Sequence, residues 1–150
     1  MDSPRDHDDG RPERSSGAAS RRRVLVVGTD DWAVEQSAAL LAEAGHETLS
    51  CHPPGEPAFP CNAFVEGRVC PLNVGFDIVL TVRARPLDQP AVGEIGVICG
   101  LRAGAALVTA GMGARNPFAS LATRALGTGA DPTTVVEAVA SARSDVVTIP

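Results

Sequence analysis

Four side chains of the metal-ligating types lie close together in the sequence, at Cys51, His52, Cys61 and Cys70. Thiolate and imidazole groups suit zinc, copper(I) or an iron–sulfur cluster. Prolines stiffen the segment between them, which is one way to hold ligands without a helix. The spacing C-H-x8-C-x8-C lacks the close C-x2-C pairs of zinc fingers and ferredoxins. The pattern therefore suggests a zinc or iron–sulfur site without matching a known one.

Other readings of these cysteines stay open. Free cysteines are among the most buried residues, so they could pack this segment against the domain. Cys61 and Cys70 could instead form a redox-active disulfide. His52 is also explained as an ordinary loop residue. Cys99 is expected to be a core residue, and it becomes a fourth ligand only if its helix faces the cysteine segment.

The sequence contains no convincing catalytic arrangement, and we do not expect an enzyme. No Ser-His-Asp order, paired carboxylates or glycine-rich phosphate loop stands out. Gly28 follows an apolar run, but a dinucleotide-binding G-x-G-x-x-G motif would need glycines where Asp30 and Ala33 stand. The GMGARN segment (111–116) is a weak candidate for an anion or partner contact, because ligands of α/β proteins bind at the carboxyl end of the sheet.

The elements that must position these residues follow an alternating β/α pattern. Val24–Val27 is a continuous β-branched run, typical of a strand buried on both faces of a parallel sheet. Asp30 and Asp31 offer N-caps for the helix that follows. Further strands are expected at 48–51, 76–82 and 106–110, and helices at 90–102, from Asn116-Pro117 to Gly127, and from Asp131-Pro132 onward. Residues 146–149 are either a short edge strand or a frayed end.

The stretch from Cys51 to Asn73 interrupts this pattern. Its prolines, at positions 53, 54, 57, 60 and 71, are incompatible with a regular helix across most of it. Long loops inside a compact domain are uncommon and are often functional. We therefore expect the cysteine segment to be the functional part of the domain.

In order and spacing, these elements resemble the receiver domain of two-component response regulators, from Arg22 to about Ala142. VLVVGTDDWAVEQSAALLAEAGHE is similar to the family's first strand, first helix and glycine turn. FDIVLTVRARP is similar to the third strand and its exit at Pro86, and LVTA to the fourth strand with Thr109 near its end. ALGTGADPTTVVEAV is similar to the late Gly-Ala-Asp turn and last helix. The resemblance implies a three-layer α/β fold, flavodoxin-like and mostly parallel, whose second helix is replaced by the cysteine- and proline-rich loop.

The same resemblance implies that the receiver chemistry is lost. Phosphoryl transfer to a receiver needs an attacking carboxylate, acidic groups that hold Mg²⁺, and a lysine. The family's acidic pair falls on Gly28 and Thr29, and the phospho-acceptor falls on Val82. The lysine-bearing fifth strand is expected to be deleted between Asp131 and Pro132, and the chain contains no lysine. A two-residue shift would bring Asp30 and Asp31 to the metal position, but helix capping also explains these acids.

Composition sets the remaining expectations. Residues 1–20 are polar and lack apolar side chains to bury, so we expect a disordered tail followed by one domain at 21–150. The net charge of −5 argues against a nucleic-acid partner. No run of apolar residues suits a membrane span or a signal peptide, so a cytoplasmic protein is expected. A receiver-like domain without phosphorylation would act on a protein partner through its last two helices and the strand between them, or as a homodimer.

Overall fold

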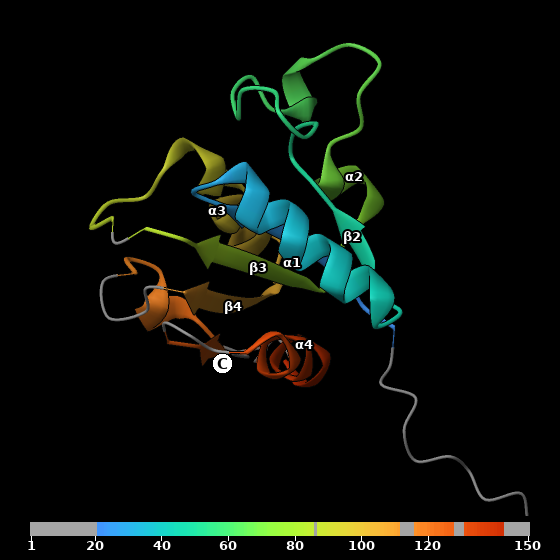
Figure 1. The fold of residues 1–150 in the computed structure, drawn as a ribbon. Helices are drawn as coiled ribbons and strands as arrows, with labels where there is room; N and C mark the ends of the chain where they lie inside the picture. Colours follow the sequence, from blue (N-terminus) through green and yellow to red (C-terminus); the bar gives the residue numbers. More distant parts are fainter. Residues whose placement is uncertain (1–20, 86, 112–115, 128–130, 143–150) are drawn as a thin grey trace, which may run out of the picture.

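A computed structural model shows a parallel sheet with helices on both faces (Figure 1), and it describes residues 21–85, 87–111, 116–127 and 131–142. Within these ranges five strands lie in the order β2-β1-β3-β4-β5, and all neighbouring pairs are parallel. This is the strand order of the flavodoxin-like doubly wound fold. The expected receiver-like α/β fold is thus confirmed. The strands are β1 (Arg23–Gly28), β2 (Glu47–Leu49), β3 (Ile78–Arg83), β4 (Ala106–Gly111) and β5 (Arg124–Ala125).

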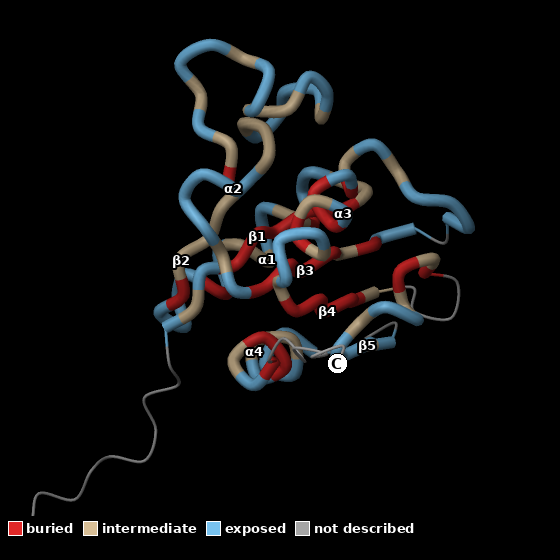
Figure 2. The backbone as a smooth tube through the Cα atoms, turned by 180° about the vertical axis from the view of Figure 1, so that it is seen from behind, coloured by how far each residue is buried: buried red, intermediate tan, exposed pale blue. Residues whose placement is uncertain are grey.

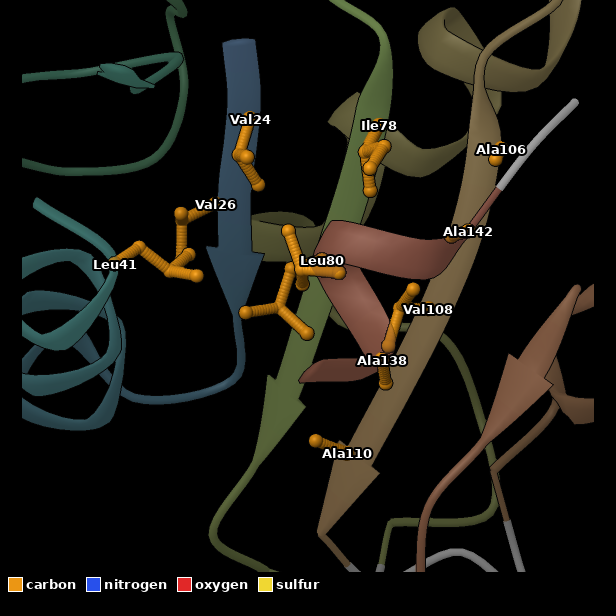
Figure 3. Close-up of a cluster of buried hydrophobic side chains, with 11 residues drawn as sticks. Val24, Val26, Leu41, Ile78, Leu80, Ala106, Val108, Ala110, Ala138 and Ala142 are labelled. Atoms are coloured by element: carbon orange, nitrogen blue, oxygen red, sulfur yellow. The ribbon is translucent and has the colours of Figure 1, made fainter. Parts of the chain in front are cut away.

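The helices form two outer layers. They are α1 (Asp31–Glu43), α2 (Pro71–Val74), α3 (Ile95–Arg102) and α4 (Pro132–Ser141). Alternate strand residues face the two layers: Val26 and Leu80 pack with Leu41 of α1 and Val139 of α4, as the close-up in Figure 3 shows for part of this cluster. On the opposite face, a second apolar cluster packs around Val97 of α3. The three central strands are therefore buried on both sides, as their continuous apolar runs predicted.

The cysteine segment projects from this core (Figure 2). Between β2 and α2 the described chain forms only one 3₁₀ turn, at Asn62–Phe64, and α2 itself is a single turn. Its residues are mostly exposed or half-buried, in contrast to the buried strands. The expected break in regular structure between Cys51 and Asn73 is present, with α2 at its end.

Two predictions about the C-terminal half are wrong. The helix expected from Asn116-Pro117 to Gly127 is absent, and this stretch forms a 3₁₀ turn at Ala119–Leu121 and then β5. The fifth strand is consequently not deleted between Asp131 and Pro132: it lies earlier, paired with Val108 and Thr109 of β4. The apolar spacing of Phe118, Leu121 and Leu126 imitated a helix, but only Phe118 is buried. The face expected to bind a partner comprised the last two helices and the strand between them. In the described residues β5 and α4 are present, but a 3₁₀ turn takes the place of the helix expected between β4 and β5.

The predicted termini lie outside the described residues. This holds for the tail at 1–20 and for the strand considered at 146–149, so both stay predictions. Most of the GMGARN segment, residues 112–115, lies outside them too.

His46 makes the stability of the fold sensitive to acid. It is only 5% exposed at the amino-terminal end of the sheet, and its Nδ1 accepts a 3.1 Å hydrogen bond from the Arg22 backbone N–H. Its Nε2 is buried without a hydrogen-bond partner among the described residues. Burial, and then the nearby Arg22 charge, lower the pKa of His46 below its ordinary value of 6.5. The imidazole is therefore neutral in the folded protein at pH 7.

We expect the free energy of unfolding to fall as the pH drops below 6.5, because the unfolded chain then binds a proton that folded His46 resists. The contribution is complete above pH 6.5 and is lost towards the lower folded pKa. Urea unfolding at about pH 7.5 and about pH 5.5 measures it. His46→Gln should show a smaller difference between the two pH values than the wild type, and an unchanged difference would contradict this assignment.

Candidate functional site

The carboxyl ends of β1 and β3 are closely packed at Gly28. Gly28 pairs in register with Val82, and the Thr29 backbone N–H donates to the Val82 carbonyl at 3.3 Å. A Cβ on Gly28 would overlap the Val82 carbonyl oxygen and lie 2.9 Å from a methyl group of Val34. Neither Gly28 nor Val82 supplies a carboxylate, and the backbone leaves no room for one at position 28.

Asp30 and Asp31 are occupied by basic partners. Asp30 is the N-cap residue of α1, as expected, but its side chain makes no capping hydrogen bond. Its carboxylate instead pairs with Arg85 at 2.9 Å and accepts a hydrogen bond from the Thr29 hydroxyl at 3.0 Å. Asp31 lies 3.3 Å from Nε2 of His52. The two carboxylates therefore serve separate contacts and do not form one pair.

Thr109, the residue expected near the end of the fourth strand, lies in β4. It is fully buried and pairs in register with Thr81 of β3. Its hydroxyl has no hydrogen-bond partner in the part of the chain that the structure describes. Thr109 is thus a core residue in this arrangement.

A buried ion pair that the sequence pattern did not predict lies at this end of the sheet. Arg83, at the end of β3, and Glu94, just before α3, both have fully buried side chains. Arg83 donates twice to the Glu94 carboxylate, from Nη2 at 2.6 Å and from Nε at 2.8 Å. Glu94 also accepts from the Thr81 hydroxyl at 2.9 Å and from the Ala91 N–H at 3.0 Å. Such a bidentate pair satisfies both charges inside the protein.

The remaining Arg83 donors tie down the loop between β3 and α3. Its Nη1 donates to the Leu87 carbonyl, and its Nη2 donates to the Gln89 carbonyl at 3.0 Å. The loop then brings Gly93 against the Gly28 carbonyl, so that a Cβ on Gly93 would overlap that oxygen. The loop backbone and the ion pair therefore pack between the end of β3 and the start of α3. An arginine directly after an apolar strand and a glutamate inside an apolar helix were the available sequence signals.

The second candidate region is a cavity between the cysteine segment and α3. Its volume is about 320 Å³, and all four cysteines of the chain line it. The cysteine segment contributes Cys51, His52, Cys61 and Cys70, and α3 contributes Cys99. The helix carrying Cys99 therefore does face the segment. Four residues that are far from Cys99 in sequence line the same cavity because the segment folds back over α3.

Backbone and side-chain contacts hold the segment in this position. The Asn62 N–H donates to the Cys51 carbonyl at 2.7 Å, and the Asn62 side chain donates to the Ser50 carbonyl at 3.3 Å. Glu56 and Arg68 form an ion pair at 2.7 Å. These contacts close the segment on itself without a helix.

Burial keeps Cys51 in the thiol form. It raises the pKa of Cys51 to about 12, with smaller contributions from Cys61, Cys99 and Cys70. The Cys51 Sγ lies beside Gly96 of α3, where a Cβ would come within 2.9 Å of it. A protonated, buried thiol is a poor nucleophile and must lose its proton before it binds a metal.

The four predicted ligands share the cavity but are not arranged as a coordination shell. Among the described residues, no group of three or more Cys, His, Asp or Glu side chains is placed to hold a metal ion. All four cysteines are free thiols. The His52 ring is engaged by Asp31. The metal site therefore stays a prediction, and so does the disulfide.

The searches for similar proteins give one structural likeness. The sequence matches no protein-family model and no curated protein. Among solved structures, the chain is similar to the crystal structure of a response regulator receiver domain protein (CheY-like) from Methanospirillum hungatei JF-1, with 18% identity and a TM-score of 0.49. The match covers 80% of this chain and 91% of that one. No described helix is long and apolar enough to cross a membrane. The fold assignment rests on the strand order and its parallel pairing.

Proposed function

We propose that this chain is a regulatory domain with a receiver-like fold that acts on a protein partner and accepts no phosphoryl group. The observation that carries the proposal is the lack of a carboxylate at the carboxyl ends of β1 and β3. Gly28 and Val82 offer no carboxylate, and on the α3 side the β3–α3 loop and the buried Arg83–Glu94 pair pack against the ends of β1 and β3. A domain with this fold and without catalytic groups works by binding.

The expected partner is a protein, with a second copy of this chain as the alternative. A net charge of −5 does not favour a nucleic acid. The proposal includes no catalytic step, because Asp30 pairs with Arg85, and Glu94 pairs with Arg83, so these carboxylates are engaged by arginines.

Titration with beryllofluoride, a stable mimic of a phosphoryl group, tests the proposal in the presence of Mg²⁺. In amide-resolved NMR spectra we expect no saturable shifts at Gly28, Val82 or Thr109, because no carboxylate is available to bind beryllium there. Saturable shifts at these three amides would overturn the proposal.

A metal or thiol-redox function is the second candidate, and the convergence of all four cysteines on one cavity favours it. Zinc, or an iron–sulfur cluster, would be held by Cys51, His52, Cys61 and Cys70. Because no three of the described ligands are in place, this function requires the segment to close around the metal. In the redox form of the hypothesis, a mild oxidant such as peroxide would take two electrons from a pair of these thiols to make a disulfide.

Metal content distinguishes these possibilities. If the site exists, protein purified anaerobically without chelator should carry about one metal ion or cluster per chain, and the metal should raise its stability. Cys61→Ser and Cys70→Ser should each abolish binding. Cys99→Ser shows whether α3 supplies a fourth ligand: the variant keeps the metal if only the cysteine segment provides ligands and loses it if Cys99 joins them. Metal-free protein whose stability is unchanged by the single Cys-to-Ser substitutions would show that these cysteines only pack.

A further inference from the structure

The cavity beneath the cysteine segment has the size and lining of a small-molecule site. Its volume of about 320 Å³ lies within the range of known ligand pockets, roughly 300–1,000 Å³. The aromatic side chains of Phe59, Phe64 and Phe76 are among its lining residues. Phe59 and Phe64 lie with their ring centroids 5.8 Å apart, and both are largely exposed. Apolar side chains that stay in contact with water at the edge of a cavity gain from any apolar molecule that covers them.

Among the described residues, no carboxylate, guanidinium or ammonium group lines the cavity. The polar members of its lining, apart from the thiols, are Asn62 and His52. Asn62 is engaged with the Ser50 carbonyl, and His52 with Asp31. Cys51 lies deep on the α3 side and stays a neutral thiol. Thiols in this state behave as polarisable apolar groups. An ionic ligand would find nothing to compensate its charge and would lose its hydration.

Glycines allow the α3 side of the cavity to pack closely against the sheet. Gly93 and Gly96 both line it, beside Val92 and Ile95. A side chain at Gly96 would meet Cys51, Val27 and Leu25 within 3.2 Å, so the floor of the cavity is already close-packed against the core. The open volume therefore lies between α3 and the cysteine segment, where the segment can adjust to an occupant without disturbing the sheet.

We propose that this cavity binds a small, uncharged, largely apolar molecule, such as an aromatic or short aliphatic compound. The inference rests on the proposed regulatory function and supplies its input: binding of this molecule takes the place of phosphorylation. Glu94 lies in the chain between the lining residues Gly93 and Ile95, and it is bonded to Arg83 at the carboxyl end of the sheet. Glu94 therefore connects the cavity wall to the β3–α3 loop through its ion pair with Arg83.

The test uses the fluorescent probe N-phenylnaphthylamine with the full chain, and its sulfonated analogue, which differs by one negative charge. We expect saturable binding of the neutral probe at one site, and binding of the sulfonated probe weaker by at least about tenfold because its charge is not compensated in the cavity. The Cys99→Phe variant, which fills the cavity from α3, should weaken the neutral probe by about tenfold or more.

Ile98→Phe is the matched control, because Ile98 is the neighbouring residue on α3, is 51% exposed and does not line the cavity. It should bind the neutral probe like the wild type. If Cys99→Phe does not fold, Ala58→Phe fills the cavity from the cysteine segment and carries the same test. Equal binding by the cavity-filling and control variants would overturn the inference, as would tight binding of Zn²⁺ alone with no binding of the neutral probe. Beryllofluoride binding would instead contradict the proposed function. The probe measurement would still show whether the cavity binds an apolar molecule.

Discussion

Glu94→Gln is expected to lower the free energy of unfolding by about 3–5 kcal/mol, because it leaves the Arg83 guanidinium buried without a counter-charge. Both side chains are fully buried, and the pair makes two direct hydrogen bonds. A loss of this size is a large part of the stability of an ordinary domain, typically about 5–15 kcal/mol. Urea unfolding followed by circular dichroism measures it.

Two comparisons separate the buried charge from general damage. Arg83→Met combined with Glu94→Gln removes both charges while keeping an oxygen acceptor for Thr81, and it should recover more than half of the loss. Glu47→Gln breaks the Arg23–Glu47 pair, whose side chains are 45% and 40% exposed, and should cost no more than about 1 kcal/mol. If Glu94→Gln costs as little as Glu47→Gln, the buried pair does not hold the loop.

Gly93→Ala is the substitution with the second largest expected effect. The added methyl group would overlap the Gly28 carbonyl oxygen, which belongs to the backbone of a central strand and cannot move aside. We expect a loss of about 1–3 kcal/mol, as for overpacking elsewhere in protein cores, and altered amide signals at Gly28 and Val82. Thermal unfolding and an amide-resolved NMR spectrum measure the two effects.

Gly127→Ala is the matched control, because a Cβ there meets no atom of the described residues within 4 Å. It should be neutral or slightly stabilising, since alanine restricts the unfolded chain more than glycine does. A Gly93→Ala protein as stable as Gly127→Ala would show that the loop does not pack against β1 as described.

The fold was predictable because its central strands are buried on both faces. The runs at Val24–Val27 and Ala106–Ala110 need no tertiary information to be recognised, and the structure places both in the sheet. The segment after Asn116 was mispredicted as a helix because three apolar residues with nearly helical spacing were taken as one face. In the structure Leu121 is 59% exposed, and the adjacent Arg124–Ala125 pairs with β4 instead.

The candidate site was predictable only in part. The clustering of Cys51, His52, Cys61 and Cys70 in sequence indicated the segment that covers the cavity, but not that Cys99 would join them from α3. The Arg83–Glu94 pair was missed because its two members are 11 residues apart on different elements. Only the return of the chain from β3 to α3 brings the two side chains together, and sequence periodicity does not report such contacts.

The mass of the intact protein after incubation with acetyl phosphate and Mg²⁺ shows directly whether the domain takes up a phosphoryl group. We predict an unchanged mass, because Val82 has no nucleophile, Gly28 has no side chain to hold the metal, and the chain contains no lysine. The addition of one phosphoryl group that hydroxylamine removes would reveal an acyl phosphate on a carboxylate. It would contradict the proposal that the domain accepts no phosphoryl group.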